Sequence, residues 1–113
     1  MDGIYSMTFR GAVGWGMGML VLRRGKVAGA DAQGVRYDGE YSETSDDLRL
    51  DLEMVVPPGV SLVQGTPPRP IQYSLPFTAT VPKHSIDAAS PVLVQLPPGP
   101  VNVIVRRLRP LDA

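Results

Sequence analysis

Hydrophobic and polar residues alternate along several stretches of this chain, with the period of two that is typical of β-strands. The clearest stretch is Leu48–Val56, in which every second residue is apolar. Arg49, Asp51 and Glu53 occupy the opposite face of this stretch. The pattern predicts a strand with one face buried in a core and the other exposed to water.

The same reasoning predicts seven or eight strands in all. Arg24 and Gly25 separate two of them, and a glycine at this place favours the positive φ that a tight hairpin needs. The predicted strands cover residues 3–9, the glycine-rich segment that ends at residue 23, and residues 26–30, 35–41, 48–56, 71–81, 92–96 and 101–109.

Proline and glycine divide the chain into two parts. All twelve prolines lie at or after Pro57, and nine of the twelve glycines lie at or before Gly39. This division predicts hairpins that turn on glycine, then a proline-rich loop over residues 57–70 and strands bounded by proline. We predict a single all-β domain over residues 1–113, a small antiparallel barrel with at most one short helical turn near residues 83–90. A sandwich of two sheets is the alternative.

Four glycines occur within residues 11–18, in the segment GAVGWGMGMLVL, so we tested this segment as a nucleotide-binding loop. A phosphate loop needs a lysine and a hydroxyl residue after its last glycine, and here methionine follows Gly16. A dinucleotide fingerprint has a different glycine spacing and opens a helix, whereas this segment runs into a strand. We therefore interpret it as a strand with Gly14, Gly16 and Gly18 along one face.

The space above these glycines leaves two interpretations open. Bulky side chains from neighbouring strands can fill it, which gives a packed barrel, or a cavity remains that takes a small apolar ligand among flexible methionines. The candidate interior residues are Tyr5, Met7, Phe9, Gly14, Gly16, Gly18, Tyr37 and Tyr41.

Composition narrows the chemistry. Eleven basic and eleven acidic residues balance to zero net charge, which disfavours a polyanionic partner. The chain has no cysteine and one histidine, His84, so it has no thiolate metal site and no set of residues typical of catalysis. We expect no enzymatic activity, no catalytic residue, no metal and no cofactor. The missing cysteines and the lack of a signal-like or membrane-spanning segment favour a cytoplasmic protein.

Two charge clusters are candidates for contact with a partner. The first is acidic and is predicted to lie in and beside the turn at residues 42–47. Exposed carboxylates of this kind steer basic partners; the four residues are Glu40, Glu43, Asp46 and Asp47. The second is the basic C-terminal set of Arg106, Arg107 and Arg109, which lacks interleaved aromatic residues. We therefore expect no direct binding of nucleic acid.

The order of short motifs in the first 47 residues resembles the GrlR-type family of negative regulators of type III secretion. The shared elements are DGIYS at residues 2–6, Phe9, the Gly16-x-Gly18 pair, Gly29-Ala-Asp31 and the Tyr37-x-Gly39-x-Tyr41 strand before an acidic loop. The resemblance implies a lipocalin-like barrel that forms a homodimer and inhibits a transcriptional activator by binding it through the acidic loop. In this chain serine and threonine interrupt that loop.

Two functions follow as hypotheses. The first is a non-enzymatic regulatory protein that binds a partner protein, with a transcriptional regulator as the candidate partner. The second is a lipocalin-like binder of a small apolar molecule in the barrel interior.

Overall fold

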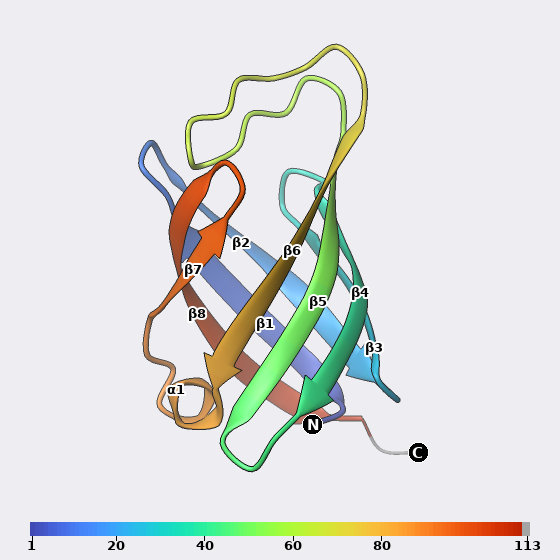
Figure 1. The fold of residues 1–113 in the computed structure, drawn as a ribbon, viewed down its shortest axis with the longest axis vertical. Coiled ribbons are helices and arrows are strands. Elements are labelled where there is room, and N and C mark those ends of the chain that lie inside the picture. Colours follow the sequence, from blue (N-terminus) through green and yellow to red (C-terminus); the bar gives the residue numbers. More distant parts are fainter. Residues whose placement is uncertain (112–113) are drawn as a thin grey trace.

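The computed structural model describes residues 1–111 as eight strands and one short helix (Figure 1). Each strand coincides with a predicted one to within a few residues. In chain order the elements are β1 (Gly3–Arg10), β2 (Trp15–Arg23), β3 (Lys26–Asp31), β4 (Arg36–Glu43), β5 (Asp47–Val56), β6 (Tyr73–Pro82), α1 (Lys83–Asp87), β7 (Val92–Leu96) and β8 (Gly99–Pro110).

The strands form one antiparallel sheet in the order β6-β5-β4-β3-β2-β1-β8-β7, which curls into a nearly closed barrel. Pairing of β8 with β1 joins the two ends of the chain, from Gly3 opposite Pro110 to Arg10 opposite Asn102. β6 and β7 are the two edges, and they contact each other without a hydrogen-bonded ladder. The predicted barrel is confirmed, and the alternative sandwich does not form.

The local signals for turns and for the helix are also confirmed. Arg24 and Gly25 have φ values of 48° and 81°, as a two-residue hairpin between β2 and β3 requires. The helix α1 spans five residues within the region where one turn was predicted. Among residues 1–111, no helix is long and apolar enough to cross a membrane.

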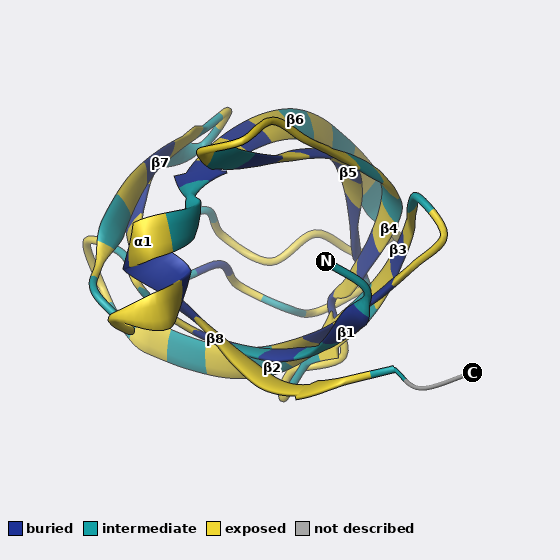
Figure 2. Ribbon diagram, turned by 90° about the horizontal axis from the view of Figure 1, so that it is seen from below, coloured by how far each residue is buried: buried dark blue, intermediate teal, exposed yellow. Residues whose placement is uncertain are grey.

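Every second side chain along most of the strands points into the barrel, so buried and exposed positions alternate along them (Figure 2). Tyr5, Leu22 and Val56 are completely buried, and Leu48 and Val35 are nearly so. Burying one such apolar side chain contributes about 1.5–3 kcal/mol to the free energy of unfolding. The period-two pattern in the sequence is therefore the pattern of this core.

The two ends of the barrel are covered differently. At the lower end in Figure 1, α1 buries Ser85 and Ile86, and the N-terminal segment lies across the opening (Figure 2). At the upper end the loop over residues 57–72 lies above the strands and buries Leu62. The amide of Val13 donates to the carbonyl oxygen of Val63 at 2.9 Å, which holds this loop to the β1–β2 connection.

The glycine-rich segment enters β2 at Trp15, and its glycines are overlaid by side chains of β1. A Cβ atom on Gly16 would lie 2.5 Å from Cζ of Phe9, and one on Gly18 would lie 2.9 Å from Cε of Met7. Gly14 lies just before the strand, where the nearest atom, Cγ1 of Val63, would be 4.0 Å from such a Cβ. Phe9 and Met7 therefore occupy most of the space that the glycines leave.

Candidate functional site

The outer face of β2 carries a row of exposed apolar side chains, which we call the β2 ridge. Its four members alternate with the inward-facing residues of the strand. Large apolar side chains in contiguous exposed positions are typical of surfaces that bind another molecule. The ridge consists of Trp15, Met17, Met19 and Val21, which are 66%, 49%, 47% and 36% exposed.

Beside the ridge, β3 presents small side chains. Ala30 lies opposite Met19 in the sheet register, and Ala28 lies opposite Val21. Both alanines are exposed. The large side chains of the ridge therefore lie beside a lower strip of small apolar side chains. This strip consists of Ala28 and Ala30, and we call it the β3 trough.

A cavity of about 100 Å³ lies inside the barrel, beneath the loop over residues 57–72. Apolar side chains of seven of the strands form most of its wall, among them Phe9, Leu52 and Val103. Gln33, Ser61 and Gln64 contribute to the lining from the β3–β4 connection and from the covering loop. The interior is therefore not completely filled by the protein's own side chains.

The candidate interior residues differ in their burial and in their contact with the cavity. Tyr5, Met7 and Tyr37 are buried in the core, and Phe9 and Tyr41 pack against it as partly buried residues. The lining of the cavity includes Met7, Phe9, Gly16 and Tyr37. Tyr5, Tyr41, Gly14 and Gly18 do not line it.

The four candidate partner-binding carboxylates are in different situations. Glu40 lies within β4 and pairs with Lys26 at 2.5 Å. Glu43 ends β4 and accepts from the N-terminal amine of Met1 at 2.8 Å and from Nζ of Lys83 at 2.9 Å. These contacts hold the pKa of Glu43 below its usual range, the bond from the terminal amine being the larger cause. Within the described residues the carboxylates of Asp46 and Asp47 make no ion pair or hydrogen bond.

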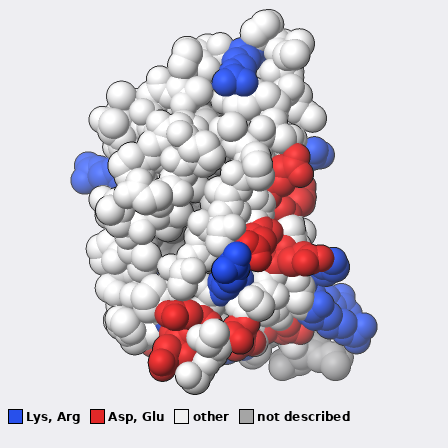
Figure 3. Space-filling model, viewed as in Figure 1, with Lys and Arg blue, Asp and Glu red and all other residues white. Residues whose placement is uncertain are grey.

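A second acidic surface lies on the outer faces of β4 and β5, and the sequence analysis missed it. The register places Asp38 opposite Glu53 and Glu40 opposite Asp51 around a shallow groove. Figure 3 shows acidic side chains along the right flank and at the lower end, and largely uncharged atoms over the rest of this face. The sequence did contain a signal for this surface. The polar residues within 35–41 and 48–56 alternate with apolar ones, and pairing the two strands as a hairpin would have placed them side by side.

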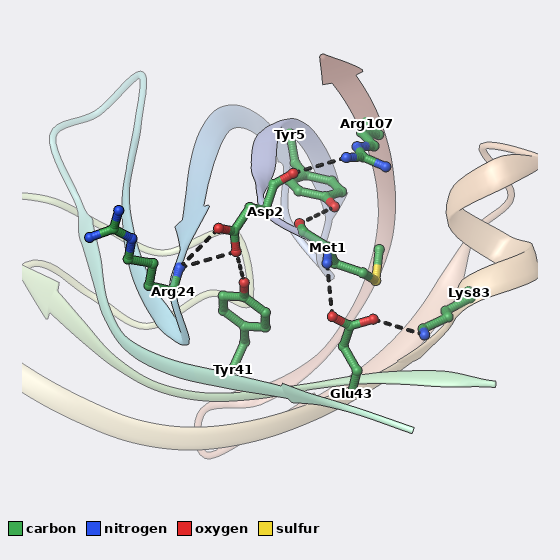
Figure 4. A network of polar contacts seen from close by, with 8 residues as sticks. All are labelled: Met1, Asp2, Tyr5, Arg24, Tyr41, Glu43, Lys83 and Arg107. Atoms are coloured by element: carbon green, nitrogen blue, oxygen red, sulfur yellow. Dashed lines mark hydrogen bonds and ion pairs between the residues drawn. The ribbon is translucent and has the colours of Figure 1, made fainter. Parts of the chain in front are cut away.

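Several residues of the DGIYS and Tyr-x-Gly-x-Tyr motifs meet at the lower end of the barrel (Figure 4). Asp2 accepts hydrogen bonds from the hydroxyl of Tyr41 and from the amide of Arg24, and both lower the pKa of Asp2, Tyr41 more than Arg24. Burial, with the hydrogen bond to Asp2, raises the pKa of Tyr41 to about 12. The hydroxyl of Tyr5 donates to the carbonyl oxygen of Met1 at 2.6 Å. This network ties the N-terminal segment to β4 and the β2–β3 hairpin.

A second motif pair is formed by Asp31 and Tyr37. The carboxylate of Asp31 accepts from the hydroxyl of Tyr37 at 2.9 Å and from the amides of Gln33 at 2.9 Å and Val35 at 3.1 Å. Burial, together with the neighbouring Asp31, raises the pKa of Tyr37 far above its ordinary value. These motif residues therefore hold neighbouring segments of the barrel together.

The histidine and the C-terminal arginines do not come together in one site. His84 is exposed on α1, and the arginines at 106, 107 and 109 lie exposed along the end of β8. Arg107 donates to the carbonyl oxygen of Asp2 at 2.9 Å and so serves the same N-terminal network. Residues 1–111 contain no group of three or more histidine and acidic side chains placed to hold a metal ion.

Comparison with family models, with curated proteins and with solved structures gives no match to this chain. The fold and surfaces define the protein as a nearly closed, eight-stranded antiparallel β-barrel with an apolar outer ridge and an internal cavity.

Proposed function

We propose that this chain is a non-enzymatic regulatory protein that acts by binding other protein surfaces and forms a homodimer in the cytoplasm. The observation that carries the proposal is the β2 ridge, in which the large side chains of Trp15, Met17 and Met19 are exposed on the outer face of one strand. The resemblance to GrlR-type regulators supports a transcriptional activator as the further partner, with this protein acting as its negative regulator.

A second copy of the chain fits the ridge because the surface is complementary to itself. A two-fold axis along the strands, between β2 and β3, would place the ridge of each copy on the trough of the other. Met19 and Val21 would then cover the exposed Ala30 and Ala28 of the second copy. Such an isologous contact uses the same patch twice, as most homodimers do.

Contact with a different, basic protein is assigned to Asp46 and Asp47. Glu40 and Glu43 already have cationic partners within the chain, whereas these two carboxylates have none among the described residues. Exposed, unpaired charges of one sign raise the rate of association with a partner of opposite sign. We therefore limit the proposed contact to two of the four acidic residues that the sequence suggested, Asp46 and Asp47.

Sedimentation equilibrium with charged variants of the ridge and trough tests the dimer. We expect Met19→Glu and Ala30→Glu each to weaken self-association by at least about 30-fold, corresponding to the roughly 2 kcal/mol of an interface hot spot. Thr80→Glu is the matched control, because Thr80 is an exposed residue on β6, away from the ridge. Equal association of all three variants and the wild type would contradict this dimer surface.

Affinity purification from the native cells tests the partner. We expect a specific protein to be retained by the wild type and by Asp51→Asn, and to be lost from the double variant Asp46→Asn/Asp47→Asn. Retention of that protein by the double variant would exclude the acidic turn as its binding site.

A further inference from the structure

The barrel cavity, which shares only Met17 with the β2 ridge, has the wall of a ligand site. Its lining comes from both halves of the barrel, with Leu50 and Met54 of β5 facing Val101 and Val105 of β8. Ala79 contributes only a methyl group to the wall, so a larger apolar side chain at this position would take up part of the cavity.

The chemistry of the lining selects an uncharged ligand. Among the described residues that form the wall, none is lysine, arginine or histidine, so a carboxylate or phosphate would be buried without a counter-charge. The single acidic residue in the wall, Asp31, already accepts three hydrogen bonds from Gln33, Val35 and Tyr37. An ammonium group would have to share the Asp31 carboxylate with these three donors and would lose its own hydration in an otherwise uncharged wall.

The size of the cavity limits the ligand to a small molecule. An apolar cavity of about 150 Å³ binds benzene in a protein interior, so a cavity of about 100 Å³ suits one ring or a short chain. Met7 and Met54 add adaptability, because an unbranched thioether side chain changes its shape at low cost. A long fatty acid exceeds this space and brings the wrong charge.

We propose that the barrel binds a small, neutral, apolar molecule, about the size of one six-membered ring, in the cavity between β1, β2, β5 and β8. A single polar group on the ligand would point to the upper end, where Gln33, Ser61 and Gln64 contribute to the lining. The loop over residues 57–72 covers the site, held by the hydrogen bond between Val13 and Val63.

The five methionines allow a direct test by NMR of protein labelled with ¹³C at the methionine methyl groups. Met7 and Met54 line the cavity from the core, and Met17 touches both the cavity and the outer ridge, so its signal does not discriminate. Met19 lies on the outer ridge alone, and Met1 lies at the opposite end of the barrel. On titration with benzyl alcohol we expect saturable shifts of the Met7 and Met54 signals, with those of Met1 and Met19 unchanged. Shifts at Met19 alone, or no saturable shift up to 10 mM, would overturn the proposal.

Charge and volume provide matched controls. Benzoate and benzylammonium share the ring of benzyl alcohol, and we expect each to bind at least 10-fold more weakly at pH 7. Equal or tighter binding of either ion would refute the chemistry assigned to the wall. Ala79→Leu adds bulk at the wall and should abolish the shifts, whereas Thr80→Leu, on the outer face of the same strand, should preserve them. If Ala79→Leu does not fold, the three probes on the wild-type protein still decide.

Discussion

Replacing Gly16 with alanine tests the account of why β2 is rich in glycine. The new Cβ would lie 2.5 Å from the ring of Phe9, so the ring would have to move. Overpacking of this kind costs about 1–3 kcal/mol, and replacing a strand glycine returns about 0.5–1 kcal/mol of backbone entropy. We expect Gly16→Ala to lower the free energy of unfolding by about 1–2 kcal/mol, measured by urea unfolding followed by circular dichroism.

Two further alanine variants serve as controls. Gly14→Ala meets nothing closer than 4.0 Å, so it should be neutral or stabilise by up to about 1 kcal/mol. Gly18→Ala would place its Cβ 2.5 Å from the carbonyl oxygen of Ala30, so it should destabilise more than Gly16→Ala.

A double-mutant cycle separates the ring from the backbone as the cause. In the presence of Phe9→Leu, the cost of Gly16→Ala should fall by at least about 1 kcal/mol, because the opposing ring is gone. Strict additivity of Gly16→Ala and Phe9→Leu would refute the reasoning. A Gly14→Ala variant as damaged as Gly16→Ala would refute it as well.

Three further predictions concern the polar contacts of Asp31, Glu43 and Tyr41. Asp31→Ala leaves the amide of Val35 and the hydroxyl of Tyr37 without an acceptor, so it should lower the free energy of unfolding by about 2–3 kcal/mol, measured by urea unfolding. Asp38 has no hydrogen-bond partner among the described residues, so the control variant Asp38→Ala should change this free energy by less than about 0.5 kcal/mol. Because the pKa of Glu43 is lowered by folding, its contribution is complete above its unfolded value of 4.5 and is lost as the pH falls through the folded value. The stability difference between wild type and Glu43→Gln should therefore be present at pH 6 and absent at pH 2, and a difference that persists at pH 2 would contradict the ion pair. The pKa of Tyr41 is raised to about 12 by folding, so its contribution to stability is complete below pH 10 and is lost as the pH rises toward 12. In an alkaline titration followed by circular dichroism, the stability of Tyr41→Phe should therefore fall less steeply with pH over this range than that of the wild type.

Much of the fold could be predicted from local patterns. Alternation predicted a strand over Leu48–Val56, and β5 spans Asp47–Val56. The Arg24-Gly25 pair predicted the hairpin, and proline marked the loop before β6. These features depend on neighbours in the sequence, which the pattern records. The predicted ends of strands differ from the structure by a few residues: β2 begins at Trp15 and so excludes Gly14, and β6 begins at Tyr73 rather than at residue 71.

The candidate sites could be predicted less completely, because they depend on contacts between distant segments. In β2 one face is glycine and the other is apolar; the sequence analysis placed the glycines in the interior, but it did not name the opposite, apolar face as an exposed surface. The cavity depends on how Leu62 and its loop close the upper end, and this is a tertiary arrangement. The sequence did not show which of the four carboxylates are paired, because the ion pairs of Glu40 and Glu43 join segments that are distant in the chain. Only the structure shows that Asp46 and Asp47 are left without such a partner among the described residues.

The most direct test of the proposed protein-binding surface uses Trp15, the single tryptophan of the chain. Trp15 is 66% exposed on the β2 ridge, so its fluorescence reports whether that surface is covered. Acrylamide quenching should fall as the protein concentration rises from below to above the dissociation constant, and Ala30→Glu should remain fully quenched at every concentration. A quenching constant that stays the same for the wild type from 0.1 to 100 µM would contradict the proposal that a second copy covers the ridge.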